Sequence, residues 1–311
     1  MLATKYFGVG GAEAYTRMFT RAVAEDAETE VLSLLDGEVE NRTAPGRYLG
    51  HLGSRSTPWT QVRFVTEALW RGRRYDLVVC SHVATAPLGM MLSRLFGIPY
   101  LVIGYGVDVW DDCGPLGRLA LQRAARVIAL SQFTARMVAT VQGVPRERIC
   151  VIYPAVESAL LGLAEEETPR PPAGGPIVLL TVARLSAIER HKACDTVIRA
   201  LPRVQADVGP VRYVIVGDGD DRPRLEALAR DLGMSAAVTF AGPAQGADLA
   251  AHYRACDVFV MPSTYERRAT GWMGEGFGIV YIEAAAFGRP VIAGQGGGAP
   301  EAVQDLSLIH I

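Results

Sequence analysis

Several features that would place a chain quickly in a protein class are sparse or missing from this sequence. Its 311 residues include five cysteines, and no two of them have the C-x-x-C spacing typical of zinc sites or redox motifs. An odd number of scattered cysteines favours free thiols in a reducing cytoplasm. The formal net charge is −2, which excludes a general electrostatic attraction to nucleic acid or to anionic membranes.

Long hydrophobic runs are also absent. The longest charge-free apolar stretch, residues 77–93, contains a serine, a histidine and a proline, and it predicts a buried strand and helix rather than a membrane span. The first residues, "MLATKYF", lack the apolar core of a signal peptide and begin in mid-strand. The last residues, "LSLIHI" (306–311), resemble an adapter-derived scar, so we expect that the natural protein continues and that the C-terminal domain is truncated here.

What is present is an alternation of short apolar runs with helical patterns. Half of the residues are hydrophobic and 21% are charged, as in an ordinary globular protein, and the length favours two domains. Continuous apolar strands between helices predict buried parallel sheets, that is, an α/β fold. The runs that we interpret as strands are 76–81, 98–106, 126–131, 148–154, 177–184, 211–219, 237–242 and 257–263.

A change of composition divides the alternation in two. Residues 163–176, "LAEEETPRPPAGGP", are acidic and then rich in proline and glycine, which is typical of a linker. We therefore predict a doubly wound, Rossmann-like domain at 1–160, a linker at 161–176 and a second Rossmann-like domain at 177–305. Within the first domain, Ser131 is placed to cap the helix that follows it.

The stretch "GWMGEGFGIVYIEAAAFGRPVIAG" (271–294) carries the clearest chemical signal. It predicts a polar loop, a helix over 278–287 that Gly288 ends, and then a strand. In open parallel sheets, ligands bind beyond the carboxyl ends of the strands, where helices begin. The free N–H groups at this helix start form an anion site suited to phosphate, and they belong to Phe277, Gly278, Ile279 and Val280.

Two glutamates, Glu275 and Glu283, flank this helix start with seven residues between them. Carboxylates are poor partners for phosphate but good acceptors for sugar hydroxyls, so a ligand with hydroxyls on both sides of a diphosphate would use both. A nucleotide sugar has that layout. Two alternatives are an ordinary ion pair of Glu283 with a lysine, and a glycosidase acid and nucleophile, which would need the sugar held between the two carboxyls.

A diphosphate leaving group also needs positive charge. Arg184 follows the first strand of the second domain, and Lys192 precedes the next helix, so both are predicted at the same edge of one sheet. The alternative is that both are ordinary exposed cations. In "GDGDDR" (217–222) three aspartates would suit a metal, although we favour a polar turn.

In the first domain, "FGVGGAEAY" (7–15) places Gly10 and Gly11 just before a helix, where the backbone can approach a phosphate or a sugar. It is not a dinucleotide fingerprint, because Glu13 stands where the third glycine of G-x-G-x-x-G belongs. Arg222 stands at the corresponding place in 217–222, so a nicotinamide-dependent oxidoreductase is the weaker hypothesis.

Taken together, these segments resemble the retaining glycosyltransferases of GT-B fold, of the large group 1 type. The E-x7-E motif "EGFGIVYIE" matches, as do "VARLSAIERHKACDTVIRAL", "IVGDGDDRPRLEALARDLG" and "GGGAPEAV", in the expected order over nearly the whole chain to about residue 305. In "VARLSAIERHKACDTVIRAL", Ala193 stands where glycine is common. The resemblance implies two Rossmann-like domains facing a cleft.

The resemblance also implies a transfer of sugar from a nucleotide-diphosphate donor with retention of anomeric configuration. Arg184 and Lys192 would hold the diphosphate, Glu283 the ribose, and Glu275 the transferred sugar, helped by the backbone of 277–279. Gly10 and Gly11 would close the site from the first domain. No cofactor or metal is implied, since cations and helix dipoles of the protein act on the leaving phosphate.

One family feature is changed. Many members have a histidine in an "HGxD" segment of the first domain, and here "GYGVDVW" (104–110) has Tyr105 in that place, followed by Asp108. The implied acceptors are sugars, lipid-linked molecules or small molecules, in a cytoplasmic protein that could touch the inner face of the membrane, although no basic amphipathic helix stands out. A non-catalytic or truncated, inactive nucleotide-sugar binder is the remaining alternative. The donor base, the sugar and the acceptor stay open.

Overall fold

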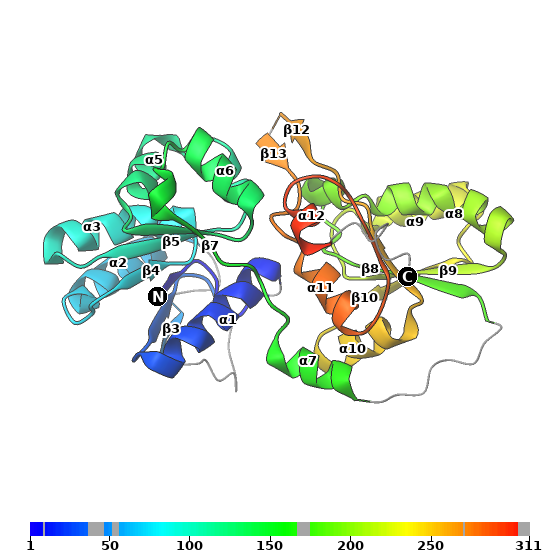
Figure 1. Ribbon diagram of the computed structural model, residues 1–311, viewed down its shortest axis with the longest axis horizontal. Coiled ribbons are helices and arrows are strands. Elements are labelled where there is room, and N and C mark those ends of the chain that lie inside the picture. The colour runs from blue at the N-terminus through cyan, green and yellow to red at the C-terminus, as the bar shows by residue number, and fades with distance from the viewer. Residues whose placement is uncertain (9, 37–46, 52–55, 167–174, 270, 304–311) are drawn as a thin grey trace. The chain divides into compact units, whose positions relative to one another are not determined.

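The computed structural model describes residues 1–8, 10–36, 47–51, 56–166, 175–269 and 271–303 of the chain (Figure 1). It divides into two compact units, Met1–Ala155 and Val156–Ile311. Each unit is built around a parallel β-sheet of its own. Within the described ranges, no helix is both long enough and apolar enough to cross a membrane.

The first unit contains a sheet with the strand order β3-β2-β1-β4-β5-β6-β7, and every pairing in it is parallel. The chain reverses its direction of winding between β1 and β4, so the sheet is doubly wound, as predicted. Its strands are β1 (Leu2–Ala3), β2 (Glu30–Ser33), β3 (Arg47–His51), β4 (Val78–Cys80), β5 (Tyr100–Gly104), β6 (Arg126–Ala129) and β7 (Ile149–Val151).

The helices of the first unit begin where the sequence supplies caps. Ser131 accepts a hydrogen bond from the Thr134 N–H and starts α6, which confirms the predicted cap. Thr57 and Thr60 form a reciprocal capping box on either side of Pro58, the first residue of α2. The helical segments are α1 (Gly11–Asp26), α2 (Pro58–Gly72), η1 (Val83–Thr85), α3 (Ala86–Phe96), α4 (Val107–Trp110), α5 (Gly114–Arg123), α6 (Gln132–Val141) and η2 (Arg146–Arg148).

The second unit has a parallel sheet with the order β10-β9-β8-β11-β14, and its winding reverses between β8 and β11. Its strands are β8 (Ile177–Val182), β9 (Val211–Val216), β10 (Val238–Gly242), β11 (Val258–Met261), β14 (Val291–Ala293) and a separate antiparallel pair, β12 (Glu266–Arg268) and β13 (Gly271–Met273). The helical segments are α7 (Ser158–Glu165), η3 (Ala187–Lys192), α8 (Cys194–Val208), α9 (Arg222–Asp231), α10 (Gly246–Ala255), α11 (Ile279–Ala286) and α12 (Ala299–Ala302).

Helices cover both faces of this second sheet, with α8 and α9 on one side and α10 and α11 on the other (Figure 1). The apolar runs of the strands supply the core, in which Leu180, Tyr213 and Phe259 are almost completely buried. Burial of such side chains contributes about 1.5–3 kcal/mol each. The sheet is thus a rigid platform, and the loops at its carboxyl edge are free to carry chemistry.

The division between the units falls a little before the predicted one. The sequence suggests a first domain to residue 160, whereas the first compact unit ends at Ala155. Helix α7 packs on α10 and α11, and its Leu160 is buried in the core of the second unit. Residues 161–165 of the predicted linker at 161–176 belong to helix α7, and residues 167–174 lie outside the described residues. The predicted scar at 306–311 also lies outside the described residues.

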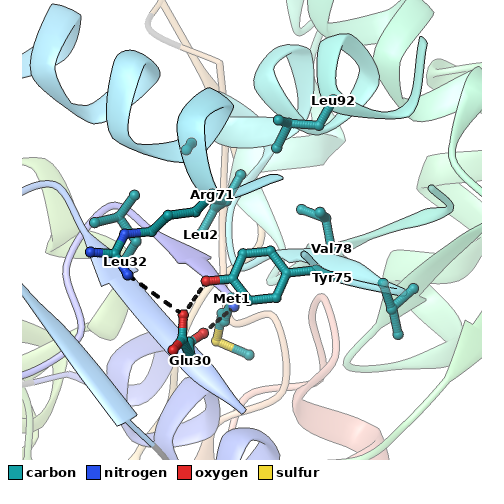
Figure 2. Close-up of a pocket in the computed structure, with 10 residues that line it drawn as sticks. Met1, Leu2, Glu30, Leu32, Arg71, Tyr75, Val78 and Leu92 are labelled. Carbon is teal, nitrogen blue, oxygen red and sulfur yellow. Dashed lines mark hydrogen bonds and ion pairs between the residues drawn. The ribbon is translucent and has the colours of Figure 1, made fainter. Parts of the chain in front are cut away.

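A small pocket lies at the amino ends of the strands of the first sheet (Figure 2). The Met1 amino group donates to the Glu30 carbonyl oxygen at 2.5 Å, and burial lowers the pKa of that amino group to about 6. Tyr75 donates to the Glu30 carboxylate. Because ligands of doubly wound sheets bind at the opposite, carboxyl edge, this pocket is not where we expect the function.

Candidate functional site

The candidate site is assembled where the winding of the second sheet reverses. Strands β8 and β11 are hydrogen-bonded neighbours, with Leu179 opposite Val258, although they are far apart in sequence. The loop after β8 carries Arg184 and Lys192, and the loop after β11 carries Glu275. A topological switch point of this kind leaves a crevice beyond the strand ends.

The central contact of the site joins these two loops. Lys192 Nζ lies 2.9 Å from Glu275 Oε1, and the two side chains are 19% and 11% exposed. The Ser263 hydroxyl donates to the same carboxylate oxygen at 3.3 Å, and His191 Nε2 lies 3.8 Å from it. The sequence analysis did not identify Ser263 or His191 as site residues. Ser263 is the last residue of the predicted strand 257–263, and His191 directly precedes Lys192.

Charge in this cluster is stabilised by its own members. Burial acts to raise the pKa of Glu275, but the charge and hydrogen bond of Lys192, with His191 and Ser263, outweigh it and lower the pKa. Burial acts to lower the pKa of Lys192, and Glu275 reverses this effect and raises it. For His191 burial prevails, and its pKa is lowered. The site therefore holds a charged pair beside a neutral imidazole at neutral pH.

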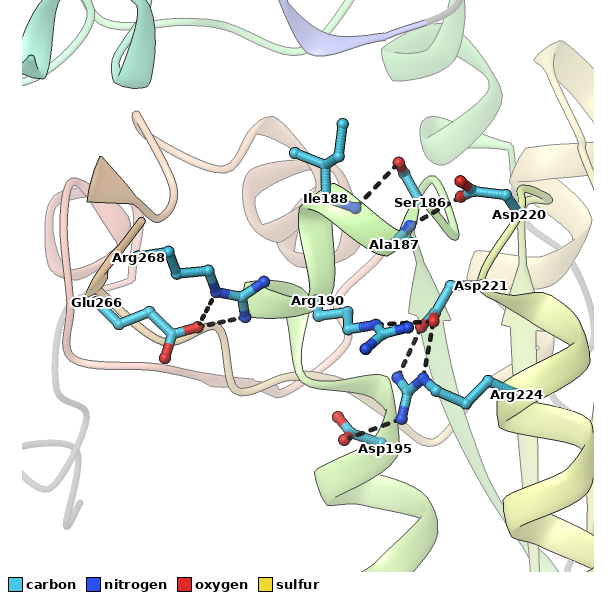
Figure 3. A network of polar contacts seen from close by, with 10 residues as sticks. All are labelled: Ser186, Ala187, Ile188, Arg190, Asp195, Asp220, Asp221, Arg224, Glu266 and Arg268. Atoms are coloured by element: carbon cyan, nitrogen blue, oxygen red, sulfur yellow. Dashed lines mark hydrogen bonds and ion pairs between the residues drawn. The ribbon is translucent and has the colours of Figure 1, made fainter. Parts of the chain in front are cut away.

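The loop that carries Arg184 and Lys192 is held in place by the turn after β9 (Figure 3). Asp221 is 4% exposed and accepts hydrogen bonds from Arg190 at 2.9 Å and from Arg224 at 2.6 and 2.7 Å. The neighbouring Asp220 accepts from the Ala187 N–H at 2.8 Å. These aspartates, which could have suggested a metal site, instead hold the cation loop in place.

Arg184 shares a pocket with Lys192 but is tied to its own loop. The lining of that pocket includes Arg184, Ser186, Glu189, Lys192 and Asp195. The Arg184 guanidinium makes a two-pronged ion pair with Glu189, at 2.8 and 2.6 Å, while its side chain remains 62% exposed. Glu189 is thus a further site residue that the sequence analysis did not identify.

The backbone conformation of Ala193, which follows the loop with Arg184 and Lys192, explains why glycine is common at this position in the family. Its φ of 57° and ψ of 33° lie in the left-handed region, and it is the only residue other than glycine with positive φ in the described part of the chain. This conformation lets the chain turn from η3 directly into α8. An alanine can adopt it only with strain.

Helix α11 begins at Ile279, one residue later than predicted, and Gly278 is its cap with a φ of 91°. A Cβ atom on Gly278 would lie 2.4 Å from the ring of Tyr281, whose hydroxyl donates to the Met261 carbonyl oxygen at 2.8 Å. The glycine therefore allows the loop to press against the first turn of the helix. The N–H groups at this start are the predicted anion donors.

The loop before α11 contains more structure than we predicted. The sequence suggests a polar loop up to Phe277, whereas β12 and β13 form a short antiparallel hairpin there. The rings of Tyr265 and Trp272 stack with their centroids 4.6 Å apart. The Glu275 carbonyl oxygen also accepts from the Gly298 N–H at 2.7 Å, so the "GGGAPEAV" segment positions the same loop.

Glu283 lies on α11, away from the Lys192 cluster. Its Oε2 accepts a hydrogen bond from the Tyr253 hydroxyl at 2.7 Å, so its partner is a tyrosine and not a lysine as the alternative suggested. Burial raises the pKa of Glu283, the Tyr253 hydrogen bond opposes this, and Glu157 adds to it.

The remaining site residues of the sequence analysis belong to the first unit. Gly10 caps α1 and Gly11 is its first residue. A Cβ atom on Gly10 would lie 2.6 Å from Glu13 Oε2, so a larger residue would require the Glu13 side chain to move. Their predicted part in a site shared with the second unit stays a prediction.

The chain is similar to known glycosyltransferases over most of its length. Residues 9–160 match the family model described as "Glycosyltransferase Family 4", and residues 164–308 match "Glycosyl transferases group 1". A "GDP-mannose-dependent alpha-(1-6)-phosphatidylinositol monomannoside mannosyltransferase" of Mycobacterium tuberculosis is 45% identical over 40% of this chain and 32% of its own length. The Mycolicibacterium smegmatis protein of that name is 33% identical over 74% of this chain and 62% of its own.

A third relative is a "D-inositol 3-phosphate glycosyltransferase" of Mycobacterium tuberculosis, 29% identical over 93% of this chain and 62% of the relative. The chain thus spans less than two thirds of the length of these relatives. Anabaena Alr3699/HepE in complex with UDP-glucose has the same fold, with a TM-score of 0.72 and 23% identity over 97% of this chain and 82% of that chain. The two matched models leave few residues uncovered, and the chain belongs to the group 1 glycosyltransferases of GT-B fold.

Proposed function

We propose that this protein transfers a sugar from a nucleotide-diphosphate sugar to an acceptor with retention of anomeric configuration. The observation that carries the proposal is the contact between Lys192 and Glu275, two residues 83 positions apart that meet at the switch point of the second sheet. Lys192 is a cation suited to phosphate, and Glu275 is a carboxylate suited to sugar hydroxyls. Because the two lie side by side, they could bind the diphosphate and the transferred sugar where these two groups of the donor are joined.

Each residue has a role that follows from its chemistry. Arg184 and Lys192 stabilise the charge that develops on the leaving diphosphate, together with the N–H groups of 277–279 at the start of α11. Glu275 accepts hydrogen bonds from the transferred sugar. Glu283 binds the donor ribose, since a carboxylate has about four acceptor positions and Tyr253 occupies one of them.

The bond-breaking step needs no protein nucleophile in this proposal. The bond between the anomeric carbon and the diphosphate oxygen breaks through an oxocarbenium-like transition state. The acceptor hydroxyl attacks on the same face, and the departing phosphate oxygen takes its proton. Positive charge from Arg184 and Lys192 lowers the energy of this departure without a metal ion.

The names of the relatives suggest which substrates to test first. Two relatives are called GDP-mannose-dependent, and their names contain phosphatidylinositol, while a third acts on D-inositol 3-phosphate. We therefore propose GDP-mannose as donor and an inositol-bearing molecule as acceptor. UDP-glucose, which is bound in one of the HepE structures, is the competing donor.

The exposed face of helix α2 is an argument for peripheral contact with the inner face of the membrane. The sequence analysis had identified no helix suited to such a contact. Trp59, Val62 and Trp70 are 74%, 54% and 64% exposed, and their spacing places them on one face of the helix. Arg74 and Arg71 lie 5.2 and 5.6 Å from the Trp70 ring centroid. Exposed tryptophans beside arginines are typical of helices that lie in the interface of anionic membranes.

This contact is tested by sedimentation with vesicles of phosphatidylcholine, with and without 30% phosphatidylinositol as an arbitrary test composition. We expect binding to the anionic vesicles, and its loss in the double variant Trp59→Ser, Trp70→Ser. The variant Val208→Ser, at another exposed apolar position, is the matched control. Equal sedimentation of the double variant and the wild type would contradict the membrane contact.

The transfer itself is tested by thermal shift with GDP, UDP and ADP, followed by a donor hydrolysis assay. A ligand at 100 times its Kd stabilises the folded state by about 2.7 kcal/mol, so the preferred nucleotide raises Tm by several degrees. Lys192→Ala and Glu283→Ala should each abolish the shift and most turnover, whereas Lys5→Ala, an exposed lysine, should retain both. Wild-type turnover in the first two variants would refute the assigned roles.

A further inference from the structure

A fully buried tyrosine, Tyr253 of α10, contacts one of the two glutamates of the E-x7-E motif. Its side chain is 0% exposed, and its hydroxyl donates to Glu283 Oε2 of α11 at 2.7 Å. Both helices also pack on α7. Because Tyr253 has no exposed surface, any part that it has in ligand binding must act through Glu283.

The Tyr253 ring is held by its neighbours in the core. It stacks on Phe287 with the ring centroids 5.3 Å apart and 22° between the planes, and it lies tilted against Phe259 at 6.1 Å. Phe287 follows the last residue of α11, and Phe259 belongs to β11. A tyrosine ring has only two side-chain torsions, so this packing leaves its hydroxyl in one place.

The Glu283 carboxylate is bonded on one oxygen and open on the other. Oε1 has no hydrogen-bond partner among the described residues, and it is not one of the buried polar atoms that lack a partner there. Solvent, and therefore a ligand, can reach this oxygen. A hydrogen bond to an ionised carboxylate is among the strong ones, so the bond on Oε2 fixes the rotation of the carboxylate and directs Oε1 to the accessible side.

The charge of Glu283 depends on opposing neighbours. Burial raises the pKa of Glu283 most, the Tyr253 hydrogen bond lowers it, and the charge of Glu157 raises it. Glu157 is the N-cap residue of α7, which packs on α11. Arg254, next to Tyr253 on α10, is paired with Glu166 instead. Tyr253 is thus the one hydrogen-bond donor to Glu283 in the described part of the chain.

We propose that Tyr253 is a positioning residue for the donor ribose, because its hydroxyl holds Glu283 in the orientation in which Oε1 accepts a hydrogen bond from a ribose hydroxyl. The ring alone would satisfy the packing, and a buried hydroxyl is unfavourable unless it is hydrogen-bonded. The identity of the ligand rests on the proposed function, whereas the pairing of Tyr253 with Glu283 does not.

Three variants with nearly unchanged shape test the proposal. Tyr253→Phe removes only the hydroxyl and keeps the stacked ring. Tyr213→Phe is the matched control, since Tyr213 is also 0% exposed in the same core but its hydroxyl is bonded to Thr181, at 2.7 Å. Glu157→Gln removes the charge that opposes the ionisation of Glu283.

The first measurement needs no ligand. NMR of the full chain with isotope-labelled glutamate follows the carboxyl groups through a pH titration, and Glu283→Gln identifies the signal of Glu283. The midpoint should rise by about one pH unit or more in Tyr253→Phe, as for the loss of a hydrogen bond to a charged group, and stay unchanged in Tyr213→Phe. Glu157→Gln should lower the midpoint, and it should bring the double variant with Tyr253→Phe back toward the wild type.

The second measurement is isothermal titration calorimetry at neutral pH with GDP and UDP, each against its 2′-deoxy and 3′-deoxy forms. The wild type and Tyr213→Phe should prefer the ribonucleotide over at least one deoxy form. Tyr253→Phe should lose about 3–10-fold of this preference, because Glu283 must then be ordered when the ribose binds. A role of Tyr253 in packing alone would leave the preference unchanged.

Thermal unfolding of each variant shows whether it is folded. If Tyr253→Phe does not fold, 3-fluorotyrosine at position 253 keeps the ring and supplies a more acidic hydroxyl, which should lower the midpoint of Glu283. An unchanged midpoint in the folded protein, a ribose preference that Tyr253→Phe retains in full, or no ribose preference in a wild type that binds the nucleotide would overturn the proposal. A shifted midpoint in a protein that binds none of these nucleotides would refute the proposed function and leave Tyr253 as the residue that orients Glu283.

Discussion

Replacing Lys192 with methionine would isolate the energy of the central ion pair. Methionine keeps the apolar stem of lysine and removes only the charge. Glu275 would then remain 11% exposed without the ammonium group that now lies 2.9 Å from it. Ser263 at 3.3 Å and His191 at 3.8 Å would be its remaining partners.

The expected cost can be worked from these distances. Two charges 2.9 Å apart attract each other by about 6 kcal/mol at an effective dielectric constant of about 20, and much of this offsets desolvation. Removing one partner of a buried pair typically costs about 3–5 kcal/mol. Because Ser263 remains as a hydrogen-bond donor, we expect about 3 kcal/mol, or a Tm lower by about 6–12 °C for a unit of this size.

The pH dependence gives a second signature. The lowered pKa of Glu275 means that its contribution is complete above the unfolded pKa of about 4.3 and is lost as the pH falls through the folded value. The raised pKa of Lys192 means that its contribution is complete below about pH 10.4. The difference between variant and wild type should therefore be largest near pH 7 and shrink only as the pH falls below about 4.3.

Differential scanning calorimetry at pH 7 and pH 3 measures both effects. Lys5→Met, at an exposed position, controls for the loss of a lysine. A Tm of Lys192→Met within 2 °C of the wild type, or an equal difference at both pH values, would refute the ion pair as a buried, stabilising contact.

Four further changes give independent readings of the site. Glu283→Gln keeps an acceptor for Tyr253 and removes a buried charge, which opposes folding above about pH 4.3 because the pKa of Glu283 is raised. The calorimetric Tm of this variant at pH 7 should therefore not fall, whereas its nucleotide-induced Tm shift should vanish. A lower Tm with an intact shift would contradict this. Gly278→Ala combines a φ of 91° with a steric clash and should lower the unfolding free energy by about 3 kcal/mol or more in urea titrations, so a neutral result would be evidence against the tight helix start. Ala193→Gly relieves a left-handed alanine and should raise stability by up to about 1 kcal/mol in the same titration, and a loss of stability would contradict the strain assigned to Ala193. With the thiol reagent DTNB, Cys150 should react first, as the one cysteine of the five that is exposed, and rapid reaction of three or more thiols would show that the described fold is open.

The sequence predicts much of the second unit because its strands are continuous apolar runs. Residues 177–184 and 257–263 contain β8 and β11, and the E-x7-E stretch predicts α11 to within one residue at its start. Strand order is not visible in such runs, since it depends on which strands pair. The direct contact of Lys192 with Glu275 therefore could not be predicted beyond a shared sheet edge.

Other elements were hidden by their composition. The acidic and proline-rich run that begins at residue 163 suggests a linker, but its first residues belong to α7, and Leu163 and Ala164 pack against the core of the second unit. The strands β12 and β13 are three residues each and lack apolar alternation, so tertiary contacts decide their state. The pairing of Arg184 with Glu189 depends on the fold of η3, a six-residue segment that is too short for a helical sequence period to be detected.

The ion pair between Arg184 and Glu189 has a consequence for how any anion enters the second unit. The guanidinium is already paired with a carboxylate from its own loop, so an arriving diphosphate would compete with Glu189 for it. Such an exchange sets the displaced carboxylate free near a newly bound ligand. A monovalent anion would be attracted to Arg184 no more strongly than the carboxylate that it replaces, whereas a more highly charged anion would be attracted more strongly. The loop can thereby discriminate among anions by their charge before any sugar or base is recognised.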